Sequence, residues 1–398
     1  MQNKQKIIVI YVIIMNCNVN GIIVYFNNIT KIHVVYKKEV NMKKNFRKVL
    51  AMATVMTTVI SLAACSQKTV PETVGKESEE KQEGLRETET GAETVTGEKI
   101  TLRLAHSQSP EHLIHKTAEN FSKLVSEKSG GTIQIDLFPG ETMGTSAEMA
   151  DACSAGDVDF YIASTGQYTQ RYKPFSIIEA FYMFRDRDHL FRFYESESFE
   201  KLKEGLAENC HVHILAPVYY GAREMTTSKK PLKTPEDFKG LKMRAANEPL
   251  PIAAIEALGG TPTPVAYNET YLALQQGVAD GQENPPMSIL AMKFYEVQDY
   301  LNLSDHQYQM MNIFMSDACK QKVSEEQLAI LTEAAEEAAS QHNERAIEEE
   351  QAAIQELSEH LEVVETDKAA FAEMMKPMYE KFSGEWLEGM YEDIQAIR

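Results

Sequence analysis

Residues 240–286 alternate between segments typical of short strands and segments typical of helices. Leu241 and Met243 fit one strand, residues 250–258 fit a helix that two glycines end, and Asn268 is placed to cap a helix that runs to Gln276. This alternation indicates an α/β fold with largely parallel sheets, because parallel strands need long connections that helices usually supply.

The same alternation begins at Lys99. Periodicity predicts strands at 100–104, 133–137, 158–163 and 212–218, and helices at 114–125 and around 145–154. Near the C-terminus, Ser324-Glu-Glu-Gln327 has the pattern of a capping box at the start of a helix rich in Ala and Glu, which we expect to run as far as Leu361. A helix of that length can brace two lobes.

A short motif, Gly-x-x-Asp, follows a predicted helix twice, at 156–159 and at 277–280. The first copy leads to polar residues at 164–167 and the second to polar residues at 282–284. If each copy belongs to its own lobe, two similar loops face one cleft, which is the architecture of hinge-bending proteins. Gly-x-x-Asp is also common where helices end, so the motif alone leaves this open.

The net charge argues against one class of partner. The 398 residues carry −19, and residues 1–64 hold nine of the 40 basic residues but one of the 59 acidic residues, so the remainder carries −27. We predict no nucleic-acid partner, because phosphate binding needs basic surfaces. An anion would bind such an acidic body only at a local site with a partly desolvated arginine.

The N-terminal part has the pattern of an export signal. Residues 43–48 form a positive segment, residues 49–62 are apolar but short for a membrane span, and Leu62-Ala-Ala-Cys65 resembles a bacterial lipobox. We therefore predict a lipoprotein signal peptide at 42–64 and lipidation of Cys65. Two acyl chains would anchor the protein to the outer face of the cytoplasmic membrane, and a periplasmic location is the alternative.

Two further segments lack the pattern of a domain. Residues 1–41 precede the signal peptide, and Lys38-Glu39-Val40 can be encoded by a ribosome-binding sequence, so we expect Met42 to be the true start and 1–41 to be a non-native leader. The apolar run at 7–15 keeps a genuine extra segment open. Residues 65–98 are rich in glutamate and lack aromatics, which predicts an acidic, disordered linker.

Four residues lie just past predicted element ends, where groups converge on ligands in α/β proteins. The planar guanidinium of Arg244 suits a carboxylate in two-point contact. Arg223 could supply a second cation, Asn284 an amide donor, and Tyr267 a stacking surface. The alternatives are a solvated strand face for Arg244, a surface position for Arg223, a turn for Asn284 and core packing for Tyr267.

No pattern in the sequence indicates a nucleophile, a metal or a nucleotide. The motifs H-E-x-x-H, G-x-S-x-G, Walker A and G-x-G-x-x-G do not occur. The pairs His112 with His115 and His211 with His213 have no third ligand nearby in sequence, and the cysteines lack zinc spacing. We therefore predict neither a cofactor nor a metal.

Three stretches of the chain resemble a known family, DctP, the extracytoplasmic solute-binding proteins of tripartite ATP-independent periplasmic (TRAP) transporters. They are YGAREMTTSKKPLKTPEDFKGLKMR, GGTPTPVAYNETYLALQQGVADGQENP and, for the opening strand, helix and strand, LRLAHSQSPEHLIHKTAENFSKLVSEKSGGTIQIDLFP. The resemblance extends from about Lys99 to the C-terminus. It implies a two-lobe, periplasmic-binding-protein-like α/β fold with hinge strands and a long bracing helix. The implied lobes are 99–220 with 309–350, and 221–308 with 351–398.

The resemblance also implies roles for individual residues. Arg244 would hold the ligand carboxylate in a two-point salt bridge, with Arg223 and Asn284 assisting and Tyr267 packing on the ligand. The first lobe would supply ligand-specific groups, for which the matching residues are His106, Gln108, Ser164 and Gln167. Some sialic-acid-binding members have a glutamate where this chain has Ser164, which argues against sialic acid and leaves C4-dicarboxylates and sugar acids such as uronates.

The expected function is that of a solute receptor, not an enzyme, which binds a small organic acid and delivers it to the TRAP membrane permease. A ligand-binding lipoprotein of a sensory system is an alternative, and neighbouring genes for permease subunits or for a sensor kinase would separate the two. A secreted enzyme acting on acidic sugars is a further alternative, because Glu141, Glu248 and Glu283 could act as acid and base, although nothing fixes their separation.

Overall fold

The computed structural model describes residues 22–26, 32–36 and 99–398. The chain divides into two units, 1–89 and 90–398, which are described separately. In the first unit, β1 (Ile22–Phe26) pairs antiparallel with β2 (Ile32–Tyr36), a hairpin that the sequence did not lead us to expect. The predicted signal peptide at 42–64, the lipidated Cys65 and the linker at 65–98 lie outside the described residues.

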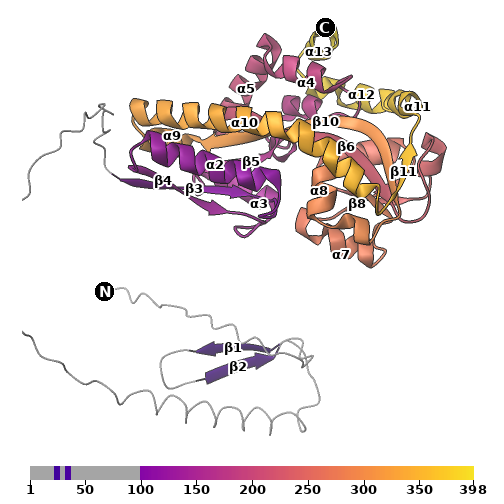
Figure 1. Cartoon of the computed structure of the whole chain (residues 1–398), viewed down its shortest axis with the longest axis horizontal. Helices are drawn as coiled ribbons and strands as arrows, with labels where there is room; N and C mark the ends of the chain where they lie inside the picture. Colours follow the sequence, from indigo (N-terminus) through magenta and orange to yellow (C-terminus); the bar gives the residue numbers. More distant parts are fainter. Residues whose placement is uncertain (1–21, 27–31, 37–98) are drawn as a thin grey trace, which may run out of the picture. The chain divides into compact units, whose positions relative to one another are not determined.

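The second unit is built on a nine-stranded sheet with the order β4-β3-β5-β10-β6-β9-β7-β8, in which β11 also pairs with β10 (Figure 1). The strands are β3 (Ile100–His106), β4 (Ile133–Phe138), β5 (Phe160–Ser164), β6 (Val212–Thr227), β7 (Lys242–Ala245), β8 (Thr261–Pro264), β9 (Gly281–Asn284), β10 (Tyr300–Ser316) and β11 (Glu362–Glu365).

Two long antiparallel strands occupy the middle of this sheet. β6 has 16 residues and β10 has 17, and their pairing runs from Val212 opposite Ser316 to Thr227 opposite Tyr300. Short parallel strands lie at both ends, β3, β4 and β5 in what we call the first half and β7, β8 and β9 in the second half. The prediction of parallel strands therefore holds within each half. The long pair that joins the halves corresponds to the hinge strands that the resemblance implied, but its length and antiparallel register were not predicted.

Helices are present at the five predicted positions, 114–125, around 145–154, 250–258, up to Gln276 and from 324 onward, whereas the other helices of residues 99–398 were not predicted. The helices are α2 (Leu113–Lys128), α3 (Ser146–Ala155), α4 (Arg187–Tyr194), α5 (Glu197–Cys210), α6 (Pro249–Ala257), α7 (Thr270–Gln275), α8 (Pro286–Ala291), α9 (Asp317–Lys322), α10 (Glu325–Leu357), α11 (Lys368–Glu373), α12 (Lys376–Phe382) and α13 (Met390–Ala396). Within residues 99–398, no helix is both long enough and apolar enough to cross a membrane.

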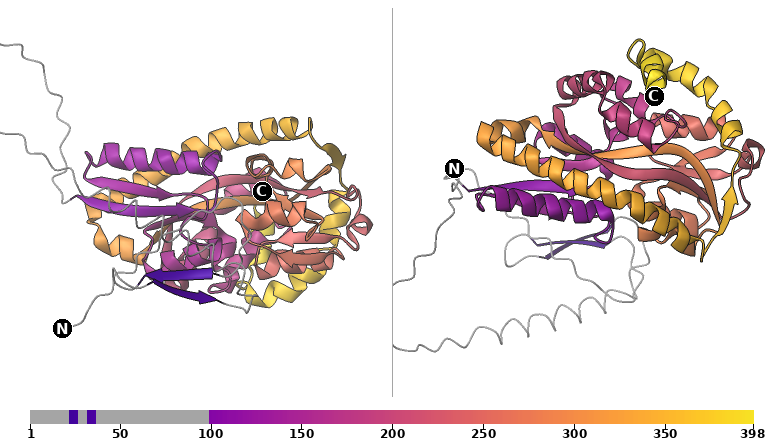
Figure 2. Two further views of the ribbon diagram at one scale, coloured as in Figure 1. Left: turned by 90° about the horizontal axis from the view of Figure 1, so that it is seen from below. Right: turned by 45° about the horizontal axis from the view of Figure 1, so that its top comes forward.

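The long helix α10 lies along the sheet, with α2 beside it at one end and α8 near the other (Figures 1 and 2). Its capping box is confirmed, because the Ser324 hydroxyl accepts the Gln327 N–H and the Gln327 side chain accepts the Ser324 N–H. The helix ends at Leu357 rather than at Leu361, since the chain turns there into β11. The predicted division into lobes changes at 220/221, 308/309 and 350/351, within β6, β10 and α10, and stays a prediction.

One predicted cap is wrong. Asn268 does not cap α7, because a 3-10 turn over Tyr267–Glu269 precedes that helix and places Glu269 at its boundary. The hydroxyl of Thr270 binds the carbonyl of Ala266 at 3.1 Å, which holds the turn against the first residue of the helix.

Both copies of the Gly-x-x-Asp motif make the same contacts in their own half. Asp159 accepts the backbone N–H of Arg103 at 2.8 Å, and Asp280 accepts that of Lys242 at 3.0 Å. The backbone N–H of each aspartate returns a hydrogen bond to the carbonyl of the same partner. Each motif thus ties one strand, β3 or β7, to the loop that precedes β5 or β9.

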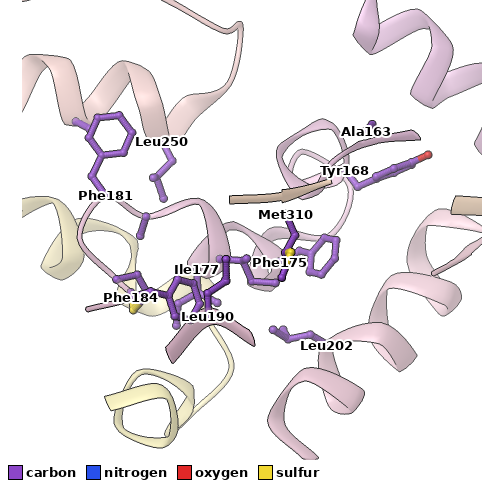
Figure 3. Packing of buried hydrophobic residues seen from close by; sticks show 14 of the residues in the cluster. Ala163, Tyr168, Phe175, Ile177, Phe181, Phe184, Leu190, Leu202, Leu250 and Met310 are labelled. Carbon is purple, nitrogen blue, oxygen red and sulfur yellow. The ribbon is translucent and has the colours of Figure 1, made fainter. Parts of the chain in front are cut away.

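The hydrophobic core continues from the first half into the second. Phe181 lies close to Leu250 of α6, Ile177 and Leu190 lie below them in this view, and Phe175 lies beside Met310 (Figure 3). The C-terminal helices α11, α12 and α13 contribute to the same cluster. This cluster therefore packs against segments of both halves.

Candidate ligand-binding cleft

A cleft of about 490 Å³ opens between the two halves of the sheet and is lined by residues from both. Of the predicted ligand-binding residues, all but His106 line this cleft. They are Gln108, Ser164, Gln167, Arg223, Arg244, Tyr267 and Asn284. The volume lies within the range typical of sites for small molecules.

His106 does not line this cleft. It is the last residue of β3, it is fully buried, and its Nε2 lies 3.0 Å from Nδ1 of His115 on α2. Burial and the neighbouring His115 lower the pKa of His106 to about 3, so the ring is neutral. The prediction placed His106 with the loop that follows, whereas its side chain faces α2 and the core.

Arg223, on β6, is buried and held from several sides. Nε and Nη2 donate to the Glu283 carboxylate, with Nη2 at 2.9 Å from Oε1, and Nη2 also contacts Asn284 Oδ1 at 3.1 Å. Nη1 donates to Gln309 Oε1 at 2.7 Å. Burial alone would lower the pKa of Arg223, but the Glu283 carboxylate raises it above the ordinary value.

Glu283 is therefore the structural partner of Arg223. Burial opposes its ionisation, but Arg223 and a hydrogen bond from His306 lower the pKa of Glu283 to about 2. Asn284, next along β9, accepts from Arg223 and donates from Nδ2 to Gln282 Oε1 at 2.7 Å. The predicted assistance of Arg223 and Asn284 to a ligand therefore competes with bonds inside the protein.

Arg244, on β7, lies in a different environment. It is 3% exposed, and its Nε donates to the backbone carbonyl of Val265 at 3.0 Å. Within residues 99–398, no carboxylate lies within salt-bridge distance of its guanidinium, in contrast to Arg223. Burial lowers the pKa of Arg244. A buried cation that lacks a counter-ion is costly, and an anionic guest would supply one.

Glu179 is a cleft residue that the sequence did not reveal. It belongs to a 3-10 segment, Lys173–Glu179, and it is 3% exposed. Oε1 accepts the backbone N–H of Gly166 at 3.0 Å, and Oε2 accepts the side-chain amides of Gln307 and Gln309, each at 2.6 Å. No motif surrounds Glu179, because its partners come from β10 and from the turn after β5.

Two hydrogen bonds join the halves across the cleft. The Tyr267 hydroxyl donates to Gln108 Oε1 at 3.0 Å, and Gln167 Nε2 donates to Glu248 Oε1 at 2.7 Å. Glu248 also packs on Gly166, where an added Cβ would lie 1.9 Å from Oε2. Ser164, at the end of β5, is half-buried beside these contacts.

The described residues contain no group of three or more His, Cys, Asp or Glu side chains arranged to hold a metal ion. The cleft wall carries two arginines, several carboxyl groups, amides and the aromatic ring of Tyr267, so it can bind a ligand through hydrogen bonds and charge.

Comparison with known proteins identifies the family. The bacterial extracellular solute-binding protein family 7, DctP, matches residues 104–385. The chain belongs to this family. It is a solute-binding protein of the two-lobe periplasmic type and not an enzyme, so the enzyme alternative is wrong.

Individual relatives agree with this assignment. The sialic acid-binding periplasmic protein SiaP of Vibrio cholerae is 31% identical over 283 residues, 71% of this chain and 88% of the relative. A TRAP periplasmic solute-binding protein from Roseobacter denitrificans, solved with β-D-glucuronate, has 28% identity and a TM-score of 0.73, covering 75% of this chain and 100% of that one. One from Sulfurospirillum deleyianum, solved with succinate, has 27% identity and a TM-score of 0.72, covering 76% and 100%.

Proposed function

We propose that this DctP-family protein captures a small organic acid through a two-point salt bridge between the ligand carboxylate and Arg244, and delivers it to the membrane permease of a TRAP transporter. The observation that carries the proposal is the buried guanidinium of Arg244, which faces the cleft and, within residues 99–398, has no carboxylate partner. A planar carboxylate matches the two parallel N–H groups of such a guanidinium.

Closure of the two halves would strengthen this ion pair. The contacts of Tyr267 with Gln108 and of Gln167 with Glu248 form only when the halves approach each other. Removal of water from the cleft lowers the local dielectric, and the attraction between opposite charges rises accordingly. The relatives solved with glucuronate and with succinate are consistent with a carboxylate as the common chemical group.

The test is a thermal-shift screen of the protein against organic acids and sugar acids, followed by calorimetry of the hits. A ligand at 100 times its dissociation constant should add about 2.7 kcal/mol of stability. Arg244→Ala should weaken binding of that ligand by about 2–5 kcal/mol, the scale for stripping one partner from a buried charged pair. Unchanged affinity in the variant would remove Arg244 from this role.

We also propose that Cys65 carries the lipid that holds the receptor at the membrane, as the lipobox pattern indicates. A bioorthogonal fatty acid should label the protein expressed from its native gene, and Cys65→Ser should abolish the label. Mass spectrometry of the mature N-terminus provides a second measurement. A free N-terminus upstream of Cys65 would contradict the proposal.

A further inference from the structure

Carboxyl groups form much of the cleft wall around Arg244. Glu141, Glu179, Glu248 and Glu283 all line it. Within residues 99–398, Glu283 is the one member of this group that forms a salt bridge. The cleft therefore contains more carboxyl groups than arginines, and this excess restricts which acids can bind there.

Glu141 is held as a hydrogen-bond acceptor at the cleft surface. Its Oε1 accepts the backbone N–H and the hydroxyl of Ser146, at 2.9 Å and 2.8 Å. The residue is 8% exposed, and its Oε2 is buried without a partner among the described residues. Its backbone has a φ of 58°, a left-handed conformation that is unfavourable for a residue with a side chain. Strain combined with an unsatisfied buried acceptor indicates a donor that a ligand supplies.

Glu248 and Glu179 also form no salt bridge among residues 99–398, but they differ in how many further hydrogen bonds they can form. Both oxygens of Glu179 already accept hydrogen bonds from the protein. Glu248 accepts one bond, from Gln167. Burial and the nearby Glu179 raise the pKa of Glu248 to about 8, so it is largely protonated at neutral pH and can donate as well as accept.

These surroundings are unfavourable for a second carboxylate on the ligand. The only other cleft arginine among residues 99–398, Arg223, is occupied by Glu283, Asn284 and Gln309. A second ligand carboxylate would therefore lie beside Glu141 or Glu179 without a cation, and like charges in a desolvated cleft repel. Ligand hydroxyl groups, in contrast, can donate to Glu141 and exchange hydrogen bonds with Glu248.

We propose that this cleft selects monocarboxylic acids that carry several hydroxyl groups, which are sugar acids, over C4-dicarboxylates, and that Glu141 determines this specificity by accepting a hydrogen bond from a ligand hydroxyl. The inference rests on the proposed function, in which Arg244 holds the one carboxylate. It goes further because the family contains proteins solved with glucuronate and with succinate, and the choice depends on residues of this chain.

A calorimetric titration of the purified protein with matched acids separates the two features expected of the ligand, a single carboxylate and several hydroxyl groups. A six-carbon set provides the comparison: hexanoate has one carboxylate and no hydroxyls, gluconate adds hydroxyls, adipate adds a second carboxylate, and galactarate adds both. Glucuronate, galacturonate and succinate complete the panel.

We expect at least one hydroxylated monocarboxylate to bind at least tenfold more tightly than succinate, adipate and galactarate. A dicarboxylate that binds as tightly or more tightly overturns the inference but leaves the receptor function intact. Absence of binding by every acid overturns the proposed function itself.

The variant Glu141→Gln tests the assigned residue. Glutamine retains a carbonyl oxygen for Ser146 but replaces the free acceptor with an amide donor. We expect the affinity for the preferred sugar acid to fall at least tenfold and the preference over adipate to shrink. Glu256→Gln, an equal change of charge at an exposed position on α6, is the matched control and should leave both affinities unchanged. An unaltered preference in Glu141→Gln, with an unaltered melting temperature without ligand, contradicts the role of Glu141. If that variant does not fold, the wild-type panel decides the specificity.

Discussion

The two buried arginines of the cleft differ in what surrounds them. Arg223 is enclosed by Glu283, Asn284 and Gln309, which lie on β9 and β10. Arg244 donates from Nε to one backbone carbonyl, and within residues 99–398 it pairs with no carboxylate. The pKa of Arg223 is raised by its partner, whereas burial lowers the pKa of Arg244. One arginine is therefore part of the protein's own structure, and the other has a place for a guest.

The difference also concerns when each site forms. The residues that bind Arg223 lie on strands that neighbour β6 in the sheet, so these contacts exist without closure. The carboxyl group of Glu248, on the second-half wall beside Arg244, is held by Gln167 of the first half, so that side of the cleft is completed when the halves meet. We infer that the contacts of Arg223 are the same with and without closure, and that the surroundings of Arg244 change when the ligand binds.

The largest effect on stability should follow from breaking the ion pair between Arg223 and Glu283. Arg223→Met leaves Glu283 buried without its arginine, and loss of one partner of a buried pair typically costs about 3–5 kcal/mol. We expect the free energy of unfolding to fall by that amount in urea denaturation without ligand.

The double variant Arg223→Met with Glu283→Gln is the control for this prediction. It removes both charges, so most of the lost stability should return, because neutral groups carry a smaller desolvation penalty. A double variant as unstable as the single one would show that the ion pair is not the reason for the loss.

The opposite outcome is expected at Arg244. Arg244→Ala should weaken ligand binding by about 2–5 kcal/mol, yet in the absence of ligand it should leave the free energy of unfolding within about 1 kcal/mol of wild type or raise it. The reason is that the variant removes a desolvated charge that has no counter-ion among residues 99–398. Calorimetry and urea denaturation of the same preparation measure both quantities. A loss of stability as large as that of Arg223→Met would erase the contrast between the sites.

Much of the fold could be predicted because its signals are local. The Ser324 capping box and the alternating apolar residues each act over a few positions. The length and register of the β6–β10 pair could not be predicted, since they depend on pairing between segments far apart in the chain. Asn268 was misplaced because a 3-10 turn and a helix start share the same residue preferences.

The site was predicted less completely, for the same reason. Arg244 and Arg223 both lie on strands, and their positions in the sequence cannot tell which one finds a carboxylate. Glu283 provides that carboxylate from a distant strand, and Glu179 is tied to two glutamines on β10. His106 was assigned to the cleft by resemblance, whereas its contact with His115 turns it away.

Two cleft carboxyls should give the protein opposite responses to pH. The pKa of Glu283 is about 2 when folded, below its ordinary value, so its stabilisation is present above about pH 4.5 and disappears as pH falls towards 2, for a total of about 3 kcal/mol. The pKa of Glu248 is about 8, above its ordinary value, so stability without ligand should decline as pH rises from about 4.5 to 8.

Unfolding free energies measured across this pH range should resolve the two groups. Glu283→Gln should remove the acid-dependent part, and Glu248→Gln should flatten the decline above pH 4.5, which is about 1.4 kcal/mol per pH unit at most. Parallel profiles for wild type and Glu248→Gln would mean that Glu248 is already ionised in the folded protein.

The smallest effect is expected from Gln167, which tests whether the Arg244 side depends on closure. Gln167→Ala removes the 2.7 Å hydrogen bond to Glu248, and a net loss of about 0.5–1.5 kcal/mol in ligand affinity is typical for one such bond. Because this bond joins the two halves, its loss should appear mainly as faster ligand dissociation in stopped-flow measurements. Gln134→Ala, at an exposed position on β4, is the control and should leave the rates unchanged. If Gln167→Ala slows association and leaves dissociation unaltered, Gln167 acts on ligand entry, and the Arg244 side forms without help from the first half.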